Sequence, residues 1–334
     1  MMPRRKRRFL MYGVVAGLAC ALAPAITRAT QPGARWPDRP VRIVNPFAVG
    51  SGSDVVARLV AEKLSQRFGQ PFVVENRPGA NAVIGTSLVS KAAPDGYTLL
   101  AGGSTSHPAN LALFKSLPYD PVEDFAPVAF MVSVHYYLVV PEGSSFHTLQ
   151  DLIRYAKANP QLANYGTGNA STTVAMELLN LFAGTKFERV NYKGNTLAAN
   201  DLLGGSLTTT FLDTSTAAPY LTGARMRALG VTAARRSSIF PDVPTMAELG
   251  YPGITMTAWN AVWAPAGTPR PIVDSLNAAI NDALKMPDVA DRIKALGFTF
   301  DGPGSRPEDL DRFVKSEIRF WARAVKQAGI PPLQ

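Results

Sequence analysis

The sequence of 334 residues contains one cysteine and three histidines. The single thiol, on Cys20, lies in an apolar segment near the N-terminus, and a chain cleaved after that segment has none. Such a chain has no disulfide, no cysteine-based metal site and no cysteine nucleophile. No group of His, Asp and Glu residues has the spacing of metal ligands either. The sequence therefore predicts neither a metal nor another cofactor.

Acidic side chains are absent from the first 29 residues, which hold six basic ones. The rest of the chain has 28 basic and 25 acidic side chains, so most of the formal net charge of +9 comes from the N-terminal segment. A charge of +3 spread over the remainder, without a long run of Lys or Arg, does not neutralise a row of phosphates. These counts argue against nucleic acid as a partner.

The N-terminal segment has the three parts of an export signal. Basic residues fill positions 4–8, residues 9–27 are uncharged and mostly apolar, and Thr27-Arg28-Ala29 forms a small-x-small cleavage pattern. We therefore expect a signal peptide over residues 1–29. Two alternatives remain open: the segment is a membrane anchor, or Cys20 is lipidated. No later segment is apolar over a length that would span a bilayer.

From residue 36 onward, short β-rich runs alternate with amphipathic stretches, which is typical of an α/β fold with largely parallel sheets. The expected helices cover 54–68, 83–92, 149–159, 174–182, 271–285 and 307–327. The expected strands cover 41–47, 72–75, 97–101, 163–165, 189–192, 207–212, 226–231 and 258–264. Thr148 and Asp151 have the spacing of a capping box at the start of the helix over 149–159.

Two nearly continuous apolar strands, 128–132 and 136–140, interrupt this alternation and indicate a crossover between two domains. The helices near the C-terminus have no strand partners close in sequence, so we expect them to complete the first domain. The predicted division is residues 30–131 plus 253–334 in lobe 1 and residues 132–252 in lobe 2. No repeat of fixed period occurs, which excludes solenoids and propellers.

Two similar loops, 46–54 and 165–172, each join the end of a strand to the start of a helix. Glycine lets the backbone approach a ligand, and the free N–H groups and positive dipole end of the following helix attract an anion. At the switch points of two sheets, the loops would face one another across a cleft. The candidate ligand-binding residues in them are Phe47, Ala48, Gly50, Ser51, Gly52, Ser53, Gly166, Gly168, Ala170, Ser171 and Thr172. The alternative is that these residues only make tight turns and cap helices.

A third edge of this site is expected after the strand over 97–101, where Ser104 and Thr105 follow two glycines. Capping of a short helix near Pro108 explains these hydroxyls equally well. Trp259 and Asn260, in a strand opposite this region, pack either on a ligand or in the core. His107, a lone histidine beside a proline, is predicted to be a surface or loop residue rather than a ligand.

Ordered motifs over some 290 residues resemble the periplasmic solute receptors of tripartite tricarboxylate transporters, often called Bug receptors. The matching segments are 36–37, 40–44, 46–47, 50–54, 74–80, 92–100, 192–194, 201–205, 240–245 and 264–269. The resemblance implies a two-lobed periplasmic binding protein of type II-like, Venus flytrap form that closes about a hinge. It further implies capture of a small carboxylate and its delivery to the permease subunits of a membrane transporter. We expect a monomer located in the periplasm.

The resemblance also bears on two charged residues. Asp213 ends a strand where the family likewise carries an acid, so it is a candidate ligand-binding residue that selects an amine or hydroxyl; a hinge or capping role is the alternative. Arg77 is either a cation for the ligand or a structural donor. The first loop departs from the family pattern, because Gly50-Ser51-Gly52 stands where paired glycines are common.

An enzyme is the main rival class. Gly50 and Gly52 after a strand, with Glu75 at the end of the next, resemble a nicotinamide site, but position 55 is Val instead of the third glycine. A serine hydrolase lacks its Gly-x-Ser-x-Gly motif. We therefore expect a receptor without enzymatic activity, and a receptor that reports to a membrane sensor remains an alternative.

The export signal makes a direct prediction. Signal peptidase should remove residues 1–29, so the mature chain should begin near Thr30 and be soluble outside the cytoplasm. Intact-mass analysis of exported protein measures this. A full-length mass would favour the anchor, and a mass increased by lipid would favour the modified Cys20.

Overall fold

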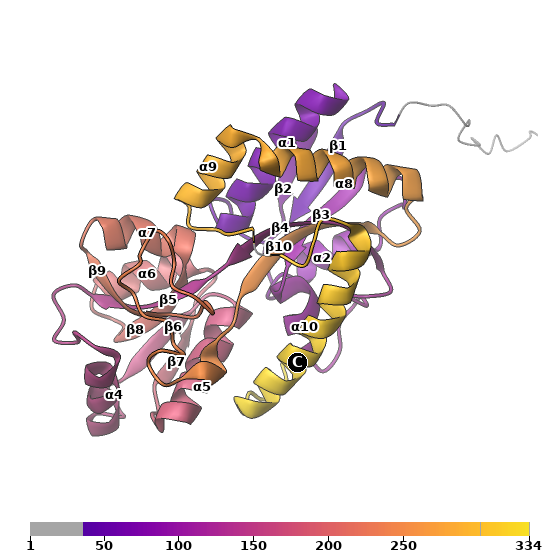
Figure 1. The fold of residues 1–334 in the computed structure, drawn as a ribbon. Coiled ribbons are helices and arrows are strands. Elements are labelled where there is room, and N and C mark those ends of the chain that lie inside the picture. Colours follow the sequence, from indigo (N-terminus) through magenta and orange to yellow (C-terminus); the bar gives the residue numbers. More distant parts are fainter. Residues whose placement is uncertain (1–35, 301, 334) are drawn as a thin grey trace, which may run out of the picture. The chain divides into compact units, whose positions relative to one another are not determined.

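The computed structural model describes residues 36–300 and 302–333. The predicted signal peptide and Cys20 lie outside the described residues. The described chain contains two five-stranded sheets flanked by helices (Figure 1). This arrangement confirms the expected two-lobed α/β fold.

The first sheet has the strand order β2-β1-β3-β10-β4. Its strands are β1 (Val41–Asn45), β2 (Phe72–Asn76), β3 (Thr98–Gly103), β4 (Phe125–Val134) and β10 (Ala258–Pro265). β1 pairs in parallel with β2 and β3, whereas β10 is antiparallel to both β3 and β4. Four strands therefore point the same way, and only β10 is reversed.

The second sheet repeats this topology with the order β7-β6-β8-β5-β9. Its strands are β5 (Tyr136–Pro141), β6 (Asn164–Thr167), β7 (Glu188–Asn191), β8 (Thr209–Asp213) and β9 (Met226–Val231). Here β5 is the reversed strand. β5 and β10 occupy equivalent places, because each is the fourth strand in the order of its sheet. The carboxyl ends of the parallel strands then carry the strand-to-helix loops of both lobes.

The helices are α1 (Gly52–Phe68), α2 (Val83–Ser90), α3 (Asn110–Leu113), α4 (Leu149–Ala158), α5 (Ala170–Ala183), α6 (Asn195–Leu203), α7 (Thr214–Thr222), α8 (Arg270–Lys285), α9 (Pro287–Ala295) and α10 (Pro307–Gln327). A π-helix, η1 (Thr105–Ala109), and a 3-10 turn, η2 (Pro252–Ile254), complete the set. All six expected helices are present, and the capping box of Thr148 and Asp151 forms as predicted. The sequence reasoning missed α6, α7 and α9.

Alternate residues of the central strands face opposite layers of helices, as the pleat of a buried strand requires. In β1, Ile43 packs in the cluster that contains α1 and α8, whereas Val44 packs with residues of α2 and α10. Figure 1 shows these two helix pairs on opposite sides of the first sheet. In β5, Leu138 and Val139 divide between two clusters in the same way.

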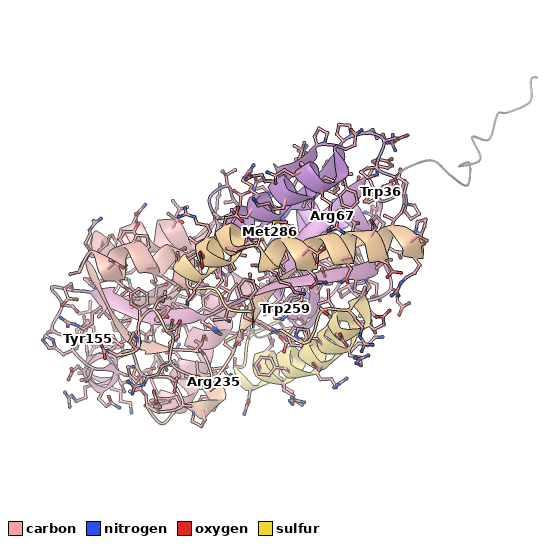
Figure 2. All side chains as sticks on the ribbon, turned by 45° about the horizontal axis from the view of Figure 1, so that its top comes forward. Trp36, Arg67, Tyr155, Arg235, Trp259 and Met286 are labelled. Atoms are coloured by element: carbon pink, nitrogen blue, oxygen red, sulfur yellow. The ribbon has the colours of Figure 1, made fainter. Side chains whose placement is uncertain are left out.

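Ion pairs on the surface connect neighbouring helices. Arg67 near the end of α1, labelled in Figure 2, lies 2.6 Å from Asp282 on α8. Both side chains are about half exposed, so the pair adds little to the packing beneath it. Between 36 and 333, residue 301 aside, no helix is both long and apolar enough to cross a membrane.

The predicted boundaries of the lobes stay a prediction. β4 runs in the first sheet as far as Val134, and β5 begins in the second sheet at Tyr136. His135 alone separates the two strands.

Gly69 offers a test of the helix ends. It caps α1 with φ 67°, a left-handed conformation with open space around the Cβ position. Gly69→Ala should therefore lower the free energy of unfolding by about 1–2 kcal/mol, the cost of a left-handed alanine. Urea denaturation measures this.

Gly143→Ala is the matched control, because that position also has open space but no left-handed φ. We expect it to leave stability unchanged or slightly raised. Equal losses in both variants would contradict the explanation.

Candidate functional site

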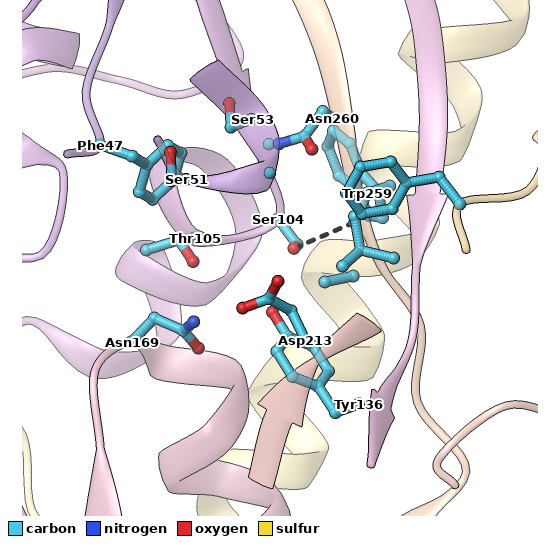
Figure 3. Close-up of a pocket in the computed structure, with 15 residues that line it drawn as sticks. Phe47, Ser51, Ser53, Ser104, Thr105, Tyr136, Asn169, Asp213, Trp259 and Asn260 are labelled. Carbon is cyan, nitrogen blue, oxygen red and sulfur yellow. Dashed lines mark hydrogen bonds between the residues drawn. The ribbon is translucent and has the colours of Figure 1, made fainter. Parts of the chain in front are cut away.

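A pocket lies among loops at the carboxyl ends of β1, β3, β6 and β8 (Figure 3). Its lining residues are Phe47, Ser51, Gly52, Ser53, Gly103, Ser104, Thr105, Val134, Tyr136, Asn169, Asp213, Ala258, Trp259, Asn260 and Phe298. The cavity volume is about 80 Å³. The pocket therefore suits a compact small molecule.

The first loop is shaped by polar side chains beneath it. Asn45 Oδ1 accepts hydrogen bonds from the Phe47 N–H and from Ser53 Oγ, both at 3.3 Å. Asn76 Nδ2 donates to the Phe47 carbonyl at 3.0 Å and to Asp54 Oδ1 at 2.9 Å. Gly50 adopts φ 78°, and its N–H donates to Asp54 Oδ2 at 2.9 Å. These contacts fix the loop, and two of the residues that take part in them, Phe47 and Ser53, also line the pocket.

Asp54 is the charged centre of this support and is only 2% exposed. Burial by itself raises the pKa of Asp54. Hydrogen bonds from Arg58, the Gly50 N–H and Asn76 outweigh burial and hold that pKa below its ordinary value. The carboxylate therefore stays ionised and keeps the loop in shape, and it does not line the pocket.

Three helices begin at the pocket, and the N-cap residue of each lines it. Ser51 caps α1, Asn169 caps α5 and Asp213 caps α7, each accepting a hydrogen bond from a backbone N–H three residues on. The first turn of a helix leaves N–H groups without helical partners, and its dipole is positive at that end. An anion in the pocket would meet these three positive ends together.

Asp213 is the only ionisable acid or base, tyrosine apart, among the described residues that line the pocket. Its carboxylate accepts hydrogen bonds from Asn195 Nδ2 at 3.0 Å, Ser215 Oγ at 2.6 Å, and the Thr216 N–H and hydroxyl at 3.1 and 2.9 Å. Tyr136 is its partner across the β5–β8 ladder. Burial raises the pKa of Tyr136, and the nearby carboxylate raises it further, so the phenol keeps its proton.

The predicted third edge is present. The Ser104 N–H donates to the Trp259 carbonyl at 3.1 Å, and the Trp259 N–H donates to Ser104 Oγ at 3.4 Å. Figure 3 shows the Ser104 and Thr105 side chains directed toward the space that Asp213 enters. The Trp259 indole is anchored away from this space, where its N–H donates to Glu317 Oε2 at 2.9 Å.

Half of the candidate residues line the pocket: Phe47, Ser51, Gly52, Ser53, Ser104, Thr105 and Asp213. The other half do not: Ala48, Gly50, Gly166, Gly168, Ala170, Ser171 and Thr172. Most of the second loop thus lies behind Asn169. Whether any of these residues contacts a ligand stays a prediction.

The second loop is constrained by its own chain rather than by the pocket. Gly168 has no left-handed φ; instead, a Cβ there would meet the backbone of Gly194 and Asn195. Thr172 is fully buried, and its hydroxyl donates to the Asn169 carbonyl at 3.0 Å and lies 2.7 Å from Thr167 Oγ1. Both residues shape the loop that presents Asn169.

The prediction of a surface or loop position for His107 was wrong. Its ring is fully buried and stacks on Trp263 at 3.8 Å between centroids. Burial lowers the pKa of His107 to about 3, so the ring is neutral. Arg77 lies outside the pocket, where its guanidinium pairs with Glu75.

Sequence reasoning did not select six of the residues that line the pocket, namely Gly103, Val134, Tyr136, Asn169, Ala258 and Phe298. Asn169 had a signal, because Asn is a favoured N-cap and the expected helix began a few residues later. Tyr136 reaches the pocket through strand register, and Phe298 belongs to no motif.

The described residues do not favour a nicotinamide site or a metal site. Glu75, the acid of the nicotinamide pattern, pairs with Arg42 at 3.4 Å and does not line the pocket. Within the described ranges 36–300 and 302–333, no cluster of three His, Cys, Asp or Glu side chains could hold a metal ion.

Comparison with known proteins gives consistent matches. Residues 56–330 match the family described as "Tripartite tricarboxylate transporter family receptor". BugT of Bordetella pertussis is 37% identical over 297 residues, which cover 88% of this chain and 90% of BugT.

Two solved structures share the fold over nearly their full length. One is Rhodopseudomonas palustris Rpa4515 with adipate, with a TM-score of 0.85 and 35% identity, covering 89% of this chain and 100% of that one. The other is MatC of the same species with bound malate, with a TM-score of 0.82 and 33% identity, covering 87% and 100%.

The support beneath the first loop makes a testable prediction. Asp54→Asn should lower the free energy of unfolding near neutral pH by about 1–3 kcal/mol, because a buried ionised acceptor is lost. The folded-state pKa of Asp54 is lowered, so its contribution is complete above the unfolded pKa of about 4 and is lost as pH falls through the lower folded value. The difference between wild type and variant should therefore shrink in acid.

Urea denaturation at several pH values measures this difference. Asp274→Asn is the matched control, since Asp274 also pairs with an arginine one helical turn away, at 2.7 Å, but is half exposed. A surface pair of this kind should cost at most about 1 kcal/mol. Equal effects of the two substitutions would contradict the role of Asp54.

Proposed function

This chain belongs to the tripartite tricarboxylate transporter receptor family, and we propose that it is a periplasmic receptor that binds a small carboxylate between its two lobes. The receptor then delivers the carboxylate to the permease subunits of a tripartite tricarboxylate-type transporter. Relatives of similar length and fold have been solved with adipate and with malate. The proposal extends that chemistry to this chain.

The observation that carries the proposal is the convergence of three helix N-termini on one pocket whose described lining holds no arginine or lysine. Ser51, Asn169 and Asp213 begin α1, α5 and α7 at the same pocket. Helix N-termini favour a negative ligand without any arginine or lysine. Among the described lining residues there is neither. Helix N-termini accept several kinds of small anion, and the relatives solved with adipate and malate favour a carboxylate among them.

Asp213 restricts which carboxylate fits. Its charge repels a second carboxylate placed against it, although four donors already share that charge. A ligand that presents a hydroxyl, an ammonium or a protonated carboxyl group toward Asp213 avoids this repulsion. We therefore propose that Asp213 receives a donor from the ligand while the helix N-termini hold its carboxylate.

The proposal assigns residues 30–131 plus 253–334 to lobe 1 and residues 132–252 to lobe 2. Gly52 at the start of α1 and Ser215 in α7 lie on different lobes, yet a Cβ on Gly52 would be 2.8 Å from Ser215 Oγ. Binding would stabilise this closed approach by bridging the lobes. The proposal includes a monomer without enzymatic activity.

The mature protein should bind carboxylates and reject their uncharged analogues. Titration calorimetry with adipate, malate and succinate, beside adipamide, measures this. We expect at least one dicarboxylate to bind and the diamide not to bind, because only the carboxylate carries charge for the helix N-termini. Absence of binding by every carboxylate, or equal binding of the diamide, would reject the proposal.

Gly52→Ala is the variant that tests the position between the lobes. The added Cβ would lie 2.6 Å from Phe298 Cζ and 2.8 Å from Ser215 Oγ, without a left-handed φ to strain the backbone. Affinity should fall by about fivefold or more, since overpacking costs about 1 kcal/mol or more. Gly143→Ala, which has open space, should bind normally. Unchanged affinity in Gly52→Ala would place the ligand elsewhere.

A further inference from the structure

Four successive residues between β2 and α2 have positive φ. The angles are 133° at Gly79, 44° at Ala80, 51° at Asn81 and 73° at Ala82. Only glycine adopts the left-handed region freely, so three consecutive non-glycine residues there must be held by their surroundings. This turn does not line the pocket.

One buried amide holds the turn. Asn110, fully buried at the start of α3, donates from Nδ2 to the Asn81 carbonyl at 2.8 Å. Asn81 Nδ2 in turn donates to Asn110 Oδ1 at 2.8 Å. The two bonds lock the left-handed turn to the beginning of α3.

Asn110 also ends the π-helix η1. Its backbone N–H donates to the carbonyls of Thr105 and His107. Its Nδ2 further donates to the Tyr119 hydroxyl at 3.3 Å, and that hydroxyl donates to the Ser106 carbonyl at 2.7 Å. Asn110 and Tyr119 therefore hold η1 in place by donating hydrogen bonds to its backbone carbonyls.

Pro108 accounts for the π geometry of η1. Proline has no N–H, so the bond that an α-helix would make from position 108 to the Ser104 carbonyl cannot form. The Ala109 N–H donates to that carbonyl instead, at 2.9 Å. The extra residue in the turn is what defines a π-helix. It places Ser104 and Thr105 at the pocket while His107 stacks on Trp263 behind them.

We propose that Asn110, held by Asn81 and Tyr119, is a positioning residue for the pocket, because it keeps η1 in the form that presents Ser104 and Thr105. Through Asn110, hydrogen bonds connect η1 to the left-handed turn over 79–82. The expected change in ligand affinity rests on the proposed function, whereas the expected change in η1 does not. Asn110 itself does not line the pocket.

Tyr119→Phe tests the proposal with little change in packing, because the ring keeps its edge contact with Phe125. Hydrogen exchange of the amides over 105–110 should become about three- to tenfold faster, because the hydrogen bond from the Tyr119 hydroxyl to the Ser106 carbonyl is lost. Affinity for adipate, or for malate if malate binds more tightly, should fall by about three- to tenfold.

Asn81→Ala removes the side-chain bond to Asn110 Oδ1, although the Asn81 carbonyl still accepts from Asn110 Nδ2, and it should act in the same direction. Both substitutions work through Asn110, so the double variant should lose less affinity than the product of the single losses. Two unrelated structural defects would multiply instead, and that result would overturn the role of Asn110.

Tyr97→Phe is the matched control in the same lobe. Its hydroxyl also makes two hydrogen bonds, with Asp38 at 2.6 and 3.1 Å, but it precedes β3 at the end far from η1. We expect unchanged exchange over 105–110 and unchanged affinity. The proposal is overturned if Tyr119→Phe leaves both measurements unchanged, or if Tyr97→Phe changes them equally. If the wild type binds no carboxylate, the proposed function fails and the exchange measurement alone decides the inference.

Discussion

The first turn of a helix leaves backbone N–H groups that no carbonyl of that helix can reach. In this chain three helices begin at one pocket, with Ser51, Asn169 and Asp213 as their N-cap residues. Much of the surrounding structure either supplies acceptors for these N–H groups or leaves them available to a ligand. The side chains that shape the first loop stand beneath it, and the Asp54 carboxylate is occupied by Arg58, Asn76 and the Gly50 N–H. The polar wall is then formed by hydroxyls, the amides of Asn169 and Asn260, the Asp213 carboxylate and main-chain groups.

Local patterns in the sequence were sufficient for most of the fold. Periodicity predicted α1, α8 and α10, the capping box predicted α4, and the ordered motifs predicted the family, which the comparison confirms. The first loop was predictable because its neighbours in space are also close in sequence, such as Asn45 and Asp54.

The rest depended on distant parts of the chain. Gly168 was taken as a residue that approaches a ligand, but it approaches the loop at Gly194, and no local pattern reports that contact. Tyr136 faces the pocket through its register with Asp213 across β5 and β8. His107 has a polar side chain and a proline neighbour, yet its stacking on Trp263 places it in the core. Polarity predicts exposure only where no aromatic partner or buried hydrogen bond competes.

The two sheets share one strand order, but the elements that follow their equivalent strands differ. After β3 comes the buried π-helix η1, whereas after β8 comes the regular helix α7 with Asp213 at its N-cap. The segment after β3 thus contributes hydroxyls on a buried turn, and the end of β8 contributes a carboxylate surrounded by donors. The two sides of the pocket differ chemically, so a ligand with two different ends should bind in one preferred orientation.

The lack of lysine and arginine along the described pocket wall also governs how an anion arrives. The field of a helix end fades within about one turn, whereas a cluster of full charges acts over a Debye length of about 8–10 Å in dilute salt. Long-range steering by the wall is therefore weak, and encounters depend on diffusion to the opening. Dissolved ions screen chiefly the Asp213 carboxylate at such a wall, so salt should not weaken capture of an anion as it would weaken capture by an arginine cluster.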